Sequence, residues 1–238
     1  KFMNKILADS EIQDSSRNMK IVPESVSYSD AEMRDKLLQL DKTCCIVKNG
    51  DSVGVCLKED ADESSSGSSM SLLAQALPLK TTQLGDPEFI KFHGLKMAYM
   101  TGSMANGIAS ENLVISSGKV GLLSSFGAAG LLPSRIEKAI KIIQKALPDG
   151  PYAFNLIHSP SEDAIERAAV DLYLKHGVRT VEASAFLGLT PNIVRYRVAG
   201  LRRNTQNQVE ITNRVIAKIS RAEVASKFMA PAPEAILN

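Results

Sequence analysis

The chain has 238 residues, and its 28 Lys and Arg against 26 Asp and Glu give a net charge of +2. With 44% hydrophobic and 23% charged residues, the composition is that of a globular protein and excludes a wholly disordered chain. The near-neutral charge gives no electrostatic signature of nucleic-acid binding, and no apolar run approaches the roughly 20 residues that span a bilayer. We therefore expect neither a nucleic acid nor a membrane as a partner.

Residues 1–85 are predicted to form a small appended α+β unit. Ser29, with Glu32 three residues later, makes a capping box that starts a helix. Residues 44–56 then read as a β-hairpin, because Asn49-Gly50 suits a tight type I′ turn.

Only three cysteines are present, and all of them lie in this hairpin. A small and odd number argues against a disulfide framework and favours a reducing compartment, so we expect a cytoplasmic protein. Two cysteines are adjacent and no Cys–His ligand set follows them, so we expect no metal site. Packing inside the hairpin unit is the predicted role of Cys44, Cys45 and Cys56.

A serine-rich segment over residues 60–71 holds six Ser and three acidic residues, and it is predicted to be a loop. The remainder, residues 86–238, changes to short apolar strands that alternate with amphipathic helices. The strands are predicted to start near residues 97, 120, 152, 178 and 215.

Helix-start signals follow several of these strands. The helix after the third strand is expected to turn Ile165 and Tyr173 toward the core. Before the fifth strand, residues 209–211 are expected to pair locally with the segment from Arg214 onward. The helix-start signals are three capping boxes, which begin at Ser134, Ser159 and Ser220, and the pair Thr190-Pro191.

Alternating strands and helices predict an α/β fold with a parallel sheet whose faces are covered. Two closures fit the pattern: an open doubly wound sheet, which five strands complete, or a (β/α)8 barrel. A barrel uses about 250 residues for eight strand–helix units, so the residues from Leu95 onward suffice for four to five units. On the barrel interpretation, this chain holds only the first five strands.

In either architecture, ligands bind beyond the carboxyl ends of the strands. Small residues follow the first two strands, at 101–107 and 126–130, and they let a flat ligand approach the backbone. Asn155, Glu182 and Lys218 stand at the ends of the next three strands. A planar heterocycle with donors and acceptors on its rim, such as an isoalloxazine, suits this set.

Each of these features also has a structural interpretation. The segment 126–130 lacks the Gly-x-Gly-x-x-Gly fingerprint and could be a plain turn. Lys218 could extend to solvent, and Glu182 could cap the next helix. Asn155 is the most informative, because an amide inside an apolar strand must find a partner. No nucleophile–base pair is visible, and His158 is read as structural, so a cofactor would carry any chemistry.

Four segments resemble the flavin-dependent enoyl reductases of polyunsaturated fatty acid synthases. The trans-acting enoyl reductases of polyketide synthases are close relatives of that family, and nitronate monooxygenases are more distant ones. The resemblance extends from about residue 23 to residue 238. The four segments are GSMANGIAS at 102–110, SFGAAG at 125–130, PYAFNLIHSP at 151–160 and VEASAF at 181–186.

The resemblance implies a TIM (β/α)8 barrel that binds FMN at the strand carboxyl ends and takes a hydride from NADPH. It also implies reduction of the 2,3 double bond of an enoyl chain held on an acyl carrier protein. The implied cofactor-binding residues are Gly102, Met104, Ala105, Gly127, Asn155, Glu182 and Lys218.

Individual roles also follow from the resemblance. The segment of Met104 and Ala105 would lie against the flavin, and Gly127 would allow close backbone approach. Asn155 would hydrogen-bond the polar edge of the ring. Lys218 would place positive charge near the pyrimidine end, where reduced flavin holds negative charge.

The ends of the chain suggest a longer protein or an excised piece. The chain begins Lys1-Phe2-Met3, and residues 235–238 read as the middle of a helix. In the family, a Gly-Gly-His stretch with the proposed proton donor and the loops that hold the FMN phosphate follow the fifth strand, so we expect the catalytic acid to lie beyond Asn238. We expect this piece alone to be inactive. Its exposed strand edges favour a homodimer or other synthase domains as partners.

Two other functions remain open at this point. One is a flavin oxidase of the nitronate monooxygenase type, and the other is a non-catalytic scaffold module of a synthase. The segment FNLIHSP at 154–160 favours the reductase over the nitronate monooxygenase, and the scaffold module remains open.

Overall fold

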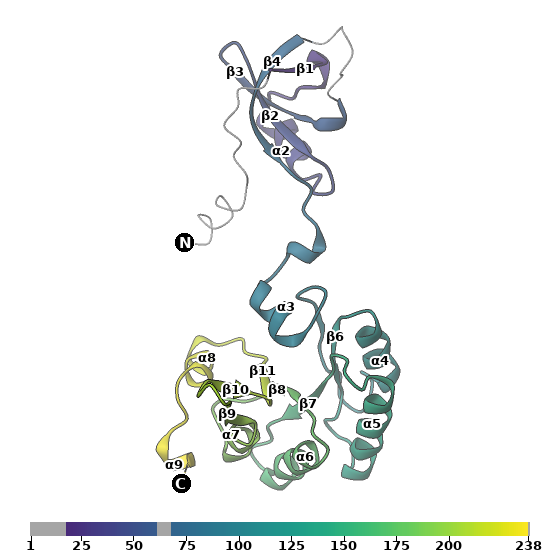
Figure 1. Cartoon of the computed structure of the whole chain (residues 1–238), viewed down its shortest axis with the longest axis vertical. Coiled ribbons are helices and arrows are strands. Elements are labelled where there is room, and N and C mark those ends of the chain that lie inside the picture. Colours follow the sequence, from purple (N-terminus) through teal and green to yellow (C-terminus); the bar gives the residue numbers. More distant parts are fainter. Residues whose placement is uncertain (1–17, 61–67, 238) are drawn as a thin grey trace. The chain divides into compact units, whose positions relative to one another are not determined.

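The computed structural model describes residues 18–60 and 68–237. The chain divides into two compact units, a first unit of residues 1–83 and a second unit of residues 84–238. Figure 1 shows the elements of each unit. Among the described residues, no helix has the length and apolar character needed to cross a membrane.

The first unit is an antiparallel four-stranded sheet of order β1-β4-β2-β3 with one helix, α2. Its core contains Cys45, Val47, Cys56 and Met70, each no more than 1% exposed. Its elements are β1 (Asn18–Ile21), α2 (Asp30–Leu37), β2 (Cys44–Asn49), β3 (Ser52–Leu57), β4 (Ser68–Ala76) and the 3-10 turns η1 (Pro23–Ser25), η2 (Lys58–Asp60) and η3 (Thr81–Gln83).

The predicted helix start and hairpin of this unit are both present. The Ser29 hydroxyl accepts a hydrogen bond from the Glu32 backbone N–H, so this capping box is confirmed. Strands β2 and β3 pair antiparallel, and the three buried cysteines are free thiols packed in the sheet. The turn is one residue later than predicted: Asn49 pairs with Ser52, and Gly50 takes the positive φ of 58°.

The loop predicted over residues 60–71 is wrong at its end, and residues 61–67 lie outside the described part of the chain. Strand β4 begins at Ser68 and pairs with both β1 and β2. Met70 is almost fully buried because it alternates with outward-facing serines, which is an ordinary strand pattern. The high serine content concealed that alternation.

The second unit is built on a parallel five-stranded sheet of order β5-β6-β7-β8-β11. Strands β9 and β10 form a separate antiparallel pair. The elements are α3 (Pro87–His93), β5 (Met100–Thr101), α4 (Glu111–Lys119), β6 (Leu123–Phe126), α5 (Pro133–Ala146), β7 (Ala153–Ile157), α6 (Asp163–Lys175), β8 (Thr180–Ser184), α7 (Pro191–Val198), β9 (Leu201–Arg203), β10 (Val209–Ile211), β11 (Arg214–Ala217), α8 (Ala222–Met229) and α9 (Glu234–Leu237).

Helices α4 to α7 cover one face of this sheet. Phe126, Phe154 and Val181 point to that face and join one core cluster with the helices. The opposite face carries Leu123 and Ala153 near the strand starts, where α3 packs against them. The helices form an arc around the sheet in Figure 1. The sheet therefore curls, with its convex face under α4 to α7 and its concave face covered by α3 at the strand starts.

The strand order decides between the two predicted closures. The five strands follow one another in chain order, with no reversal at any point. A doubly wound sheet reverses its order and places helices on both faces. The curled parallel sheet is therefore of the barrel type, and the doubly wound alternative is wrong.

Three predicted helix starts are also wrong. Helix α5 begins at Pro133, before Ser134, because proline at the first helical position presets φ. Ser159 and Glu162 close a turn by hydrogen bonds to each other, and α6 begins one residue after it. Ser220 makes no cap for α8. Thr190 caps α7 as predicted, by accepting a hydrogen bond from the Ile193 N–H.

Two further predictions in this unit need correction. Tyr173 is buried as predicted, but Ile165 is 50% exposed, because α6 turns Glu166 and Val170 inward instead. Strand β10 pairs with β9 and not with the segment from Arg214 onward, which joins the parallel sheet beside β8. The segment Arg214–Ala217 instead pairs with Thr180–Ala183 along the free side of strand β8.

Two buried tyrosines on helices donate hydrogen bonds to backbone carbonyls, one in strand β7 and one just before strand β8. Tyr173 on α6 donates a 2.6 Å hydrogen bond to the Asn155 carbonyl, and Tyr196 on α7 donates a 2.8 Å bond to the Val178 carbonyl. Both side chains are fully buried. Burial raises the pKa of both phenols, so both hydroxyls remain donors at neutral pH.

We expect Tyr196→Phe to lower the free energy of unfolding by about 1–2 kcal/mol, because the Val178 carbonyl loses its side-chain donor. Denaturant unfolding monitored by circular dichroism measures this. Tyr99→Phe is the matched control, since Tyr99 is 52% exposed. Equal stability of the two variants would contradict the role given to the buried hydroxyl.

The loops after β5 and β6 pack backbone against backbone. Gly107 N–H donates to the Gly127 carbonyl at 2.9 Å, and Gly127 N–H donates to the Ala109 carbonyl at 3.0 Å. A Cβ on Gly127 would overlap the Met104 carbonyl oxygen. Only glycine fits at position 127, and the contact sets where the first loop lies.

We expect Gly127→Ala to cost about 3 kcal/mol or more of unfolding free energy, since neither backbone can withdraw without breaking these hydrogen bonds. Thermal and denaturant unfolding measure the loss. Gly188→Ala is the control, because its Cβ would lie an ordinary 3.6 Å from Lys227 Cδ. A Gly127→Ala variant as stable as wild type would disprove the close approach.

Candidate functional site

The concave face gathers polar side chains at the carboxyl ends of the strands. Strand alternation points Ser125, Asn155 and Glu182 to this face, opposite the helices. Asn155 and Glu182 are register partners on neighbouring strands. Lys218 follows β11, and its backbone N–H donates to the Ala183 carbonyl. Three of the predicted residues, Asn155, Glu182 and Lys218, thus meet at the carboxyl ends of neighbouring strands.

The Glu182 carboxylate is the centre of this edge. It is 1% exposed, and one oxygen accepts a 2.8 Å hydrogen bond from the Ser103 backbone N–H. The other oxygen, Oε1, lies 3.1 Å from the Lys218 ammonium. Lys218 itself is half exposed, so the ion pair has one buried and one solvated member.

Burial acts most strongly on the pKa of Glu182 and would raise it. The Ser125 and Ser103 hydrogen-bonding groups and the Lys218 ammonium together outweigh burial, so the pKa lies below its usual value. Glu182 is therefore a carboxylate at neutral pH. Its Oε1 is paired with the Lys218 ammonium, and the Ser125 hydroxyl, although it lowers the pKa of Glu182, makes no hydrogen bond of normal geometry within the described chain.

Small residues open the space beside this pair. A Cβ on Gly102 would lie 3.4 Å from Glu182 Oε1 and 3.9 Å from Lys218 Nζ. Met104 and Ala105 follow in the same loop and are exposed. Gly127 is buried against the Met104 carbonyl, so its direct role is to seat that loop. The predicted residues of the first two strands thus lie in adjoining loops.

Asn155 joins β7 to β8. Its side-chain amide donates to the Glu182 carbonyl at 3.2 Å and to the Ser184 hydroxyl at 2.8 Å. Both N–H groups are therefore engaged within the sheet, and the amide oxygen is the atom that can meet a ligand. The sequence predicted that the Asn155 amide needs a partner, and two groups of the neighbouring strand β8 supply it.

Sequence reasoning missed Ser103, Ser125 and Ser184. Serines carry weak signals, and only the period-two alternation on the strands could have pointed to Ser125. His158 is held by a 2.9 Å contact from its Nδ1 to buried Glu166, and it points to the helical layer, which agrees with its structural interpretation. Among residues 18–60 and 68–237, no cluster of three or more His, Cys, Asp or Glu side chains could hold a metal ion.

Sequence comparisons relate the chain to two kinds of synthase protein. It is 42% identical over 97% of its length to one polyunsaturated fatty acid synthase protein of Thraustochytrium sp., and 53% identical over 68% of its length to a second one from the same organism. It is 44% identical over 65% to the polyketide biosynthesis protein PksE of Bacillus subtilis. The chain spans only 15%, 8% and 20% of these relatives. No protein-family model matches it.

A solved structure agrees with these relatives. The enoyl reductase domain of MlnA, from the macrolactin biosynthesis cluster of Bacillus amyloliquefaciens, superimposes with a TM-score of 0.64 at 39% identity. The match covers 66% of this chain and 36% of that one. The predicted resemblance is therefore confirmed: the chain is related in sequence to polyunsaturated fatty acid synthases and polyketide biosynthesis proteins, and in sequence and fold to an enoyl reductase domain.

Proposed function

We propose that the chain is part of an FMN- and NADPH-dependent enoyl reductase, which reduces the 2,3 double bond of enoyl intermediates carried on an acyl carrier protein. The observation that carries the proposal is the buried Glu182–Lys218 pair at the carboxyl edge of a curled parallel sheet. The relation to an enoyl reductase domain supports enoyl reduction as the reaction. The synthase relatives support a role in polyunsaturated fatty acid or polyketide synthesis.

The residues at this edge fit a flavin. The buried Ser125 hydroxyl lacks a hydrogen bond of normal geometry within the described chain, and a polar ring edge would supply one. Gly102 leaves space beside the ion pair, and Lys218 brings a cation. FMN, when bound, would supply two-electron transfer from NADPH to the substrate double bond.

The chain's own residues would prepare the site for that chemistry. Lys218 would stabilise negative charge on the ring, and Glu182 would hold the ammonium in place. Asn155 would offer its amide oxygen while keeping β7 and β8 aligned. Met104 and Ala105 would form the wall against the ring, on a loop seated by Gly127.

We also propose that the five strands belong to an eight-stranded barrel. They follow one order and curl, and β5 and β11 are the terminal strands of the sheet as described. On this proposal, residues 86–238 are the amino-terminal portion of the barrel and residues 1–85 are an appended unit. Other synthase domains or a second copy would cover the remaining edges, and the piece alone would be inactive.

We expect Lys218→Ala to weaken FMN retention roughly ten- to a hundredfold in the longer natural protein. The loss of one charge-assisted contact is worth about 1.5–3 kcal/mol. The FMN-to-protein ratio after dialysis, read from flavin absorbance, measures this. Lys145→Ala on the outer face of α5 is the control. Equal flavin content in both variants would reject the role of Lys218.

Asn155→Leu should also lower flavin occupancy, because the Ser184 hydroxyl and the Glu182 carbonyl lose their donor. Occupancy and thermal unfolding are measured on the same samples. Wild-type occupancy in a folded Asn155→Leu protein would count against the site.

The reaction itself is tested in the longer protein with an enoyl thioester of acyl carrier protein. NADPH oxidation that depends on the enoyl substrate supports the reductase. Oxidation of a nitroalkane without NADPH would instead indicate a nitronate monooxygenase. A protein that binds no flavin and turns over neither substrate would be a scaffold module.

A further inference from the structure

A cavity lies at the opposite end of the sheet from the Glu182–Lys218 pair. It has a volume of about 370 Å³ and is bordered by residues at the starts of four strands. Leu123 begins β6, Tyr152 precedes β7, Thr180 begins β8 and Arg214 begins β11. His93, the last residue of α3, closes one side. This volume is within the range of small-molecule sites.

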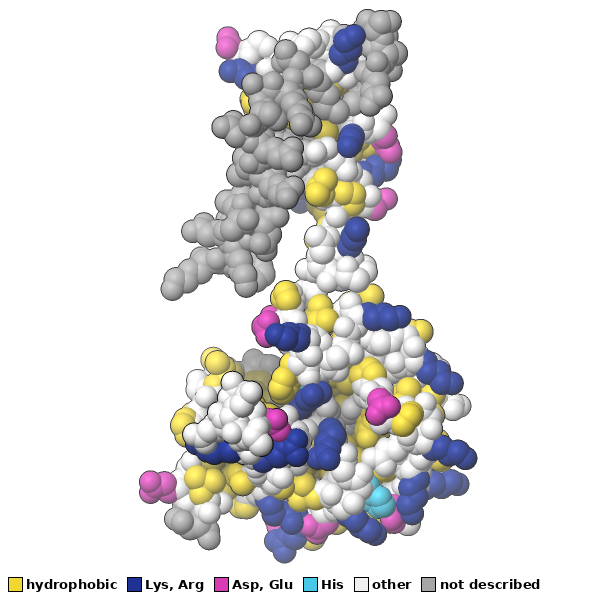
Figure 2. Space-filling model, in the orientation of Figure 1, with side chains coloured by type: hydrophobic (Ala, Val, Ile, Leu, Met, Phe, Trp, Pro, Cys, Tyr) yellow, Lys and Arg dark blue, Asp and Glu magenta, His cyan; other side chains and the backbone are white. Residues whose placement is uncertain are grey.

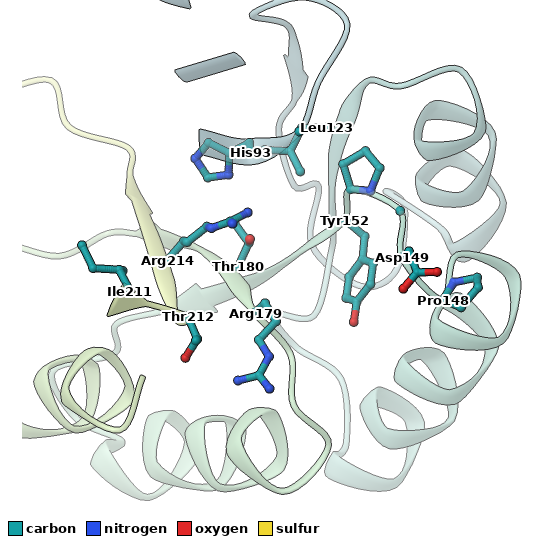
Figure 3. Close-up of a pocket in the computed structure, with 13 residues that line it drawn as sticks. His93, Leu123, Pro148, Asp149, Tyr152, Arg179, Thr180, Ile211, Thr212 and Arg214 are labelled. Atoms are coloured by element: carbon teal, nitrogen blue, oxygen red, sulfur yellow. The ribbon is translucent and has the colours of Figure 1, made fainter. Parts of the chain in front are cut away.

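The cavity is bordered by two arginines and one carboxylate, and none of them is ion-paired with another. Arg179 and Arg214 both line it, and among the described residues neither lies within ion-pair distance of a carboxylate. Asp149 also borders the cavity but pairs with neither arginine (Figure 3). Figure 2 shows Lys and Arg side chains gathered around a hollow in the face of the second unit. The electrostatic environment favours an anion.

The arginines are held in place by neutral contacts. The Arg214 guanidinium lies 4.7 Å over the Phe92 ring. Arg179 donates a 3.4 Å hydrogen bond to Asn213 Oδ1. Neither contact neutralises the guanidinium charge, and burial lowers the pKa of Arg214. Arginine remains charged at physiological pH in spite of such a shift.

Two buried polar atoms in this cavity have no partner within the described chain. They are His93 Nδ1 and Arg214 Nε, and the His93 residue is only 8% exposed. Burial, and then the charge of Arg214, lower the pKa of His93 to about 4, so the ring is neutral at pH 7 and can present an N–H. An unsatisfied buried donor is costly, and an acceptor placed between these residues would relieve that cost.

We propose that this cavity is an oxyanion-binding site, in which Arg214, Arg179 and His93 bind the phosphate or carboxylate group of a small molecule. Guanidinium groups bind both oxyanions through paired N–H donors. The cavity is larger than a bare anion, and Leu123 and Tyr152 offer apolar contact to the remainder of the ligand. The site is separate from the proposed flavin site, because it lies at the amino-terminal ends of the strands.

The test titrates the 238-residue chain with inorganic phosphate and, in a second arm, with acetate, each against potassium chloride at equal ionic strength. Proton NMR of the His93 ring reports the pKa, and thermal unfolding reports binding. We expect a saturable rise of the midpoint and a His93 pKa that rises from about 4, because a bound anion stabilises the imidazolium. The arm with the stronger effect tells phosphate from carboxylate.

Variants assign the effect to the site. Arg214→Gln should abolish the response, and Arg179→Gln should weaken binding at least roughly tenfold. Arg179 is exposed, so its variant remains informative if the Arg214→Gln chain does not fold. Arg202→Gln is the control, since Arg202 is exposed and pairs with Glu210 outside the cavity. A response no greater than that to chloride, or one unchanged by Arg179→Gln, would overturn the proposal.

Discussion

The ion pair between Glu182 and Lys218 is the interaction on which the carboxyl edge of the sheet depends. A carboxylate that is 1% exposed is tolerated only when cations and donors compensate its lost hydration. Here the compensation comes from two other strand ends, through the Ser103 N–H after β5 and the Lys218 ammonium after β11. The carboxylate thus links the first and last strands of the sheet across its concave face.

This arrangement explains why the site residues are not interchangeable. Gly102 keeps open the space beside the ion pair, since a Cβ there would lie in ordinary contact, at 3.4 Å from Glu182 Oε1 and 3.9 Å from Lys218 Nζ. Gly127 must be small, since the Met104 carbonyl occupies its Cβ position. One glycine makes space for a ligand, and the other lets two loops touch. Both conditions follow from how closely the strand ends approach one another.

The two ends of the concave face differ in their electrostatic balance. At the carboxyl end, the Lys218 cation is matched by the Glu182 carboxylate. At the amino-terminal end, Arg179 and Arg214 form no ion pair among the described residues, although Asp149 borders the same cavity, and His93 is neutral. Helices α4 to α7 cover the convex face, and α3 covers the concave face only at the strand starts.

Much of the fold was predictable because it depends on short-range patterns. The alternation of apolar runs with amphipathic stretches located all five parallel strands to within a few residues, and the hairpin cysteines were correctly placed in a core. The helix starts at Ser134, Ser159 and Ser220 were wrong, because a capping motif competes with proline, turns and packing that lie outside a four-residue window. Strand β4 was missed because its high serine content is typical of a loop and concealed the alternation of buried and exposed residues.

The sequence by itself determined the α/β class, the strand positions and the polar residues that end each strand, since these depend on residue type and spacing. Only the tertiary structure decided the strand order, the curl of the sheet and the pairing of Glu182 with Lys218 and Ser103. It alone brought His93, Arg179 and Arg214 to one cavity. These features join residues that are tens of positions apart, and no local preference specifies which distant strand a segment will pair with.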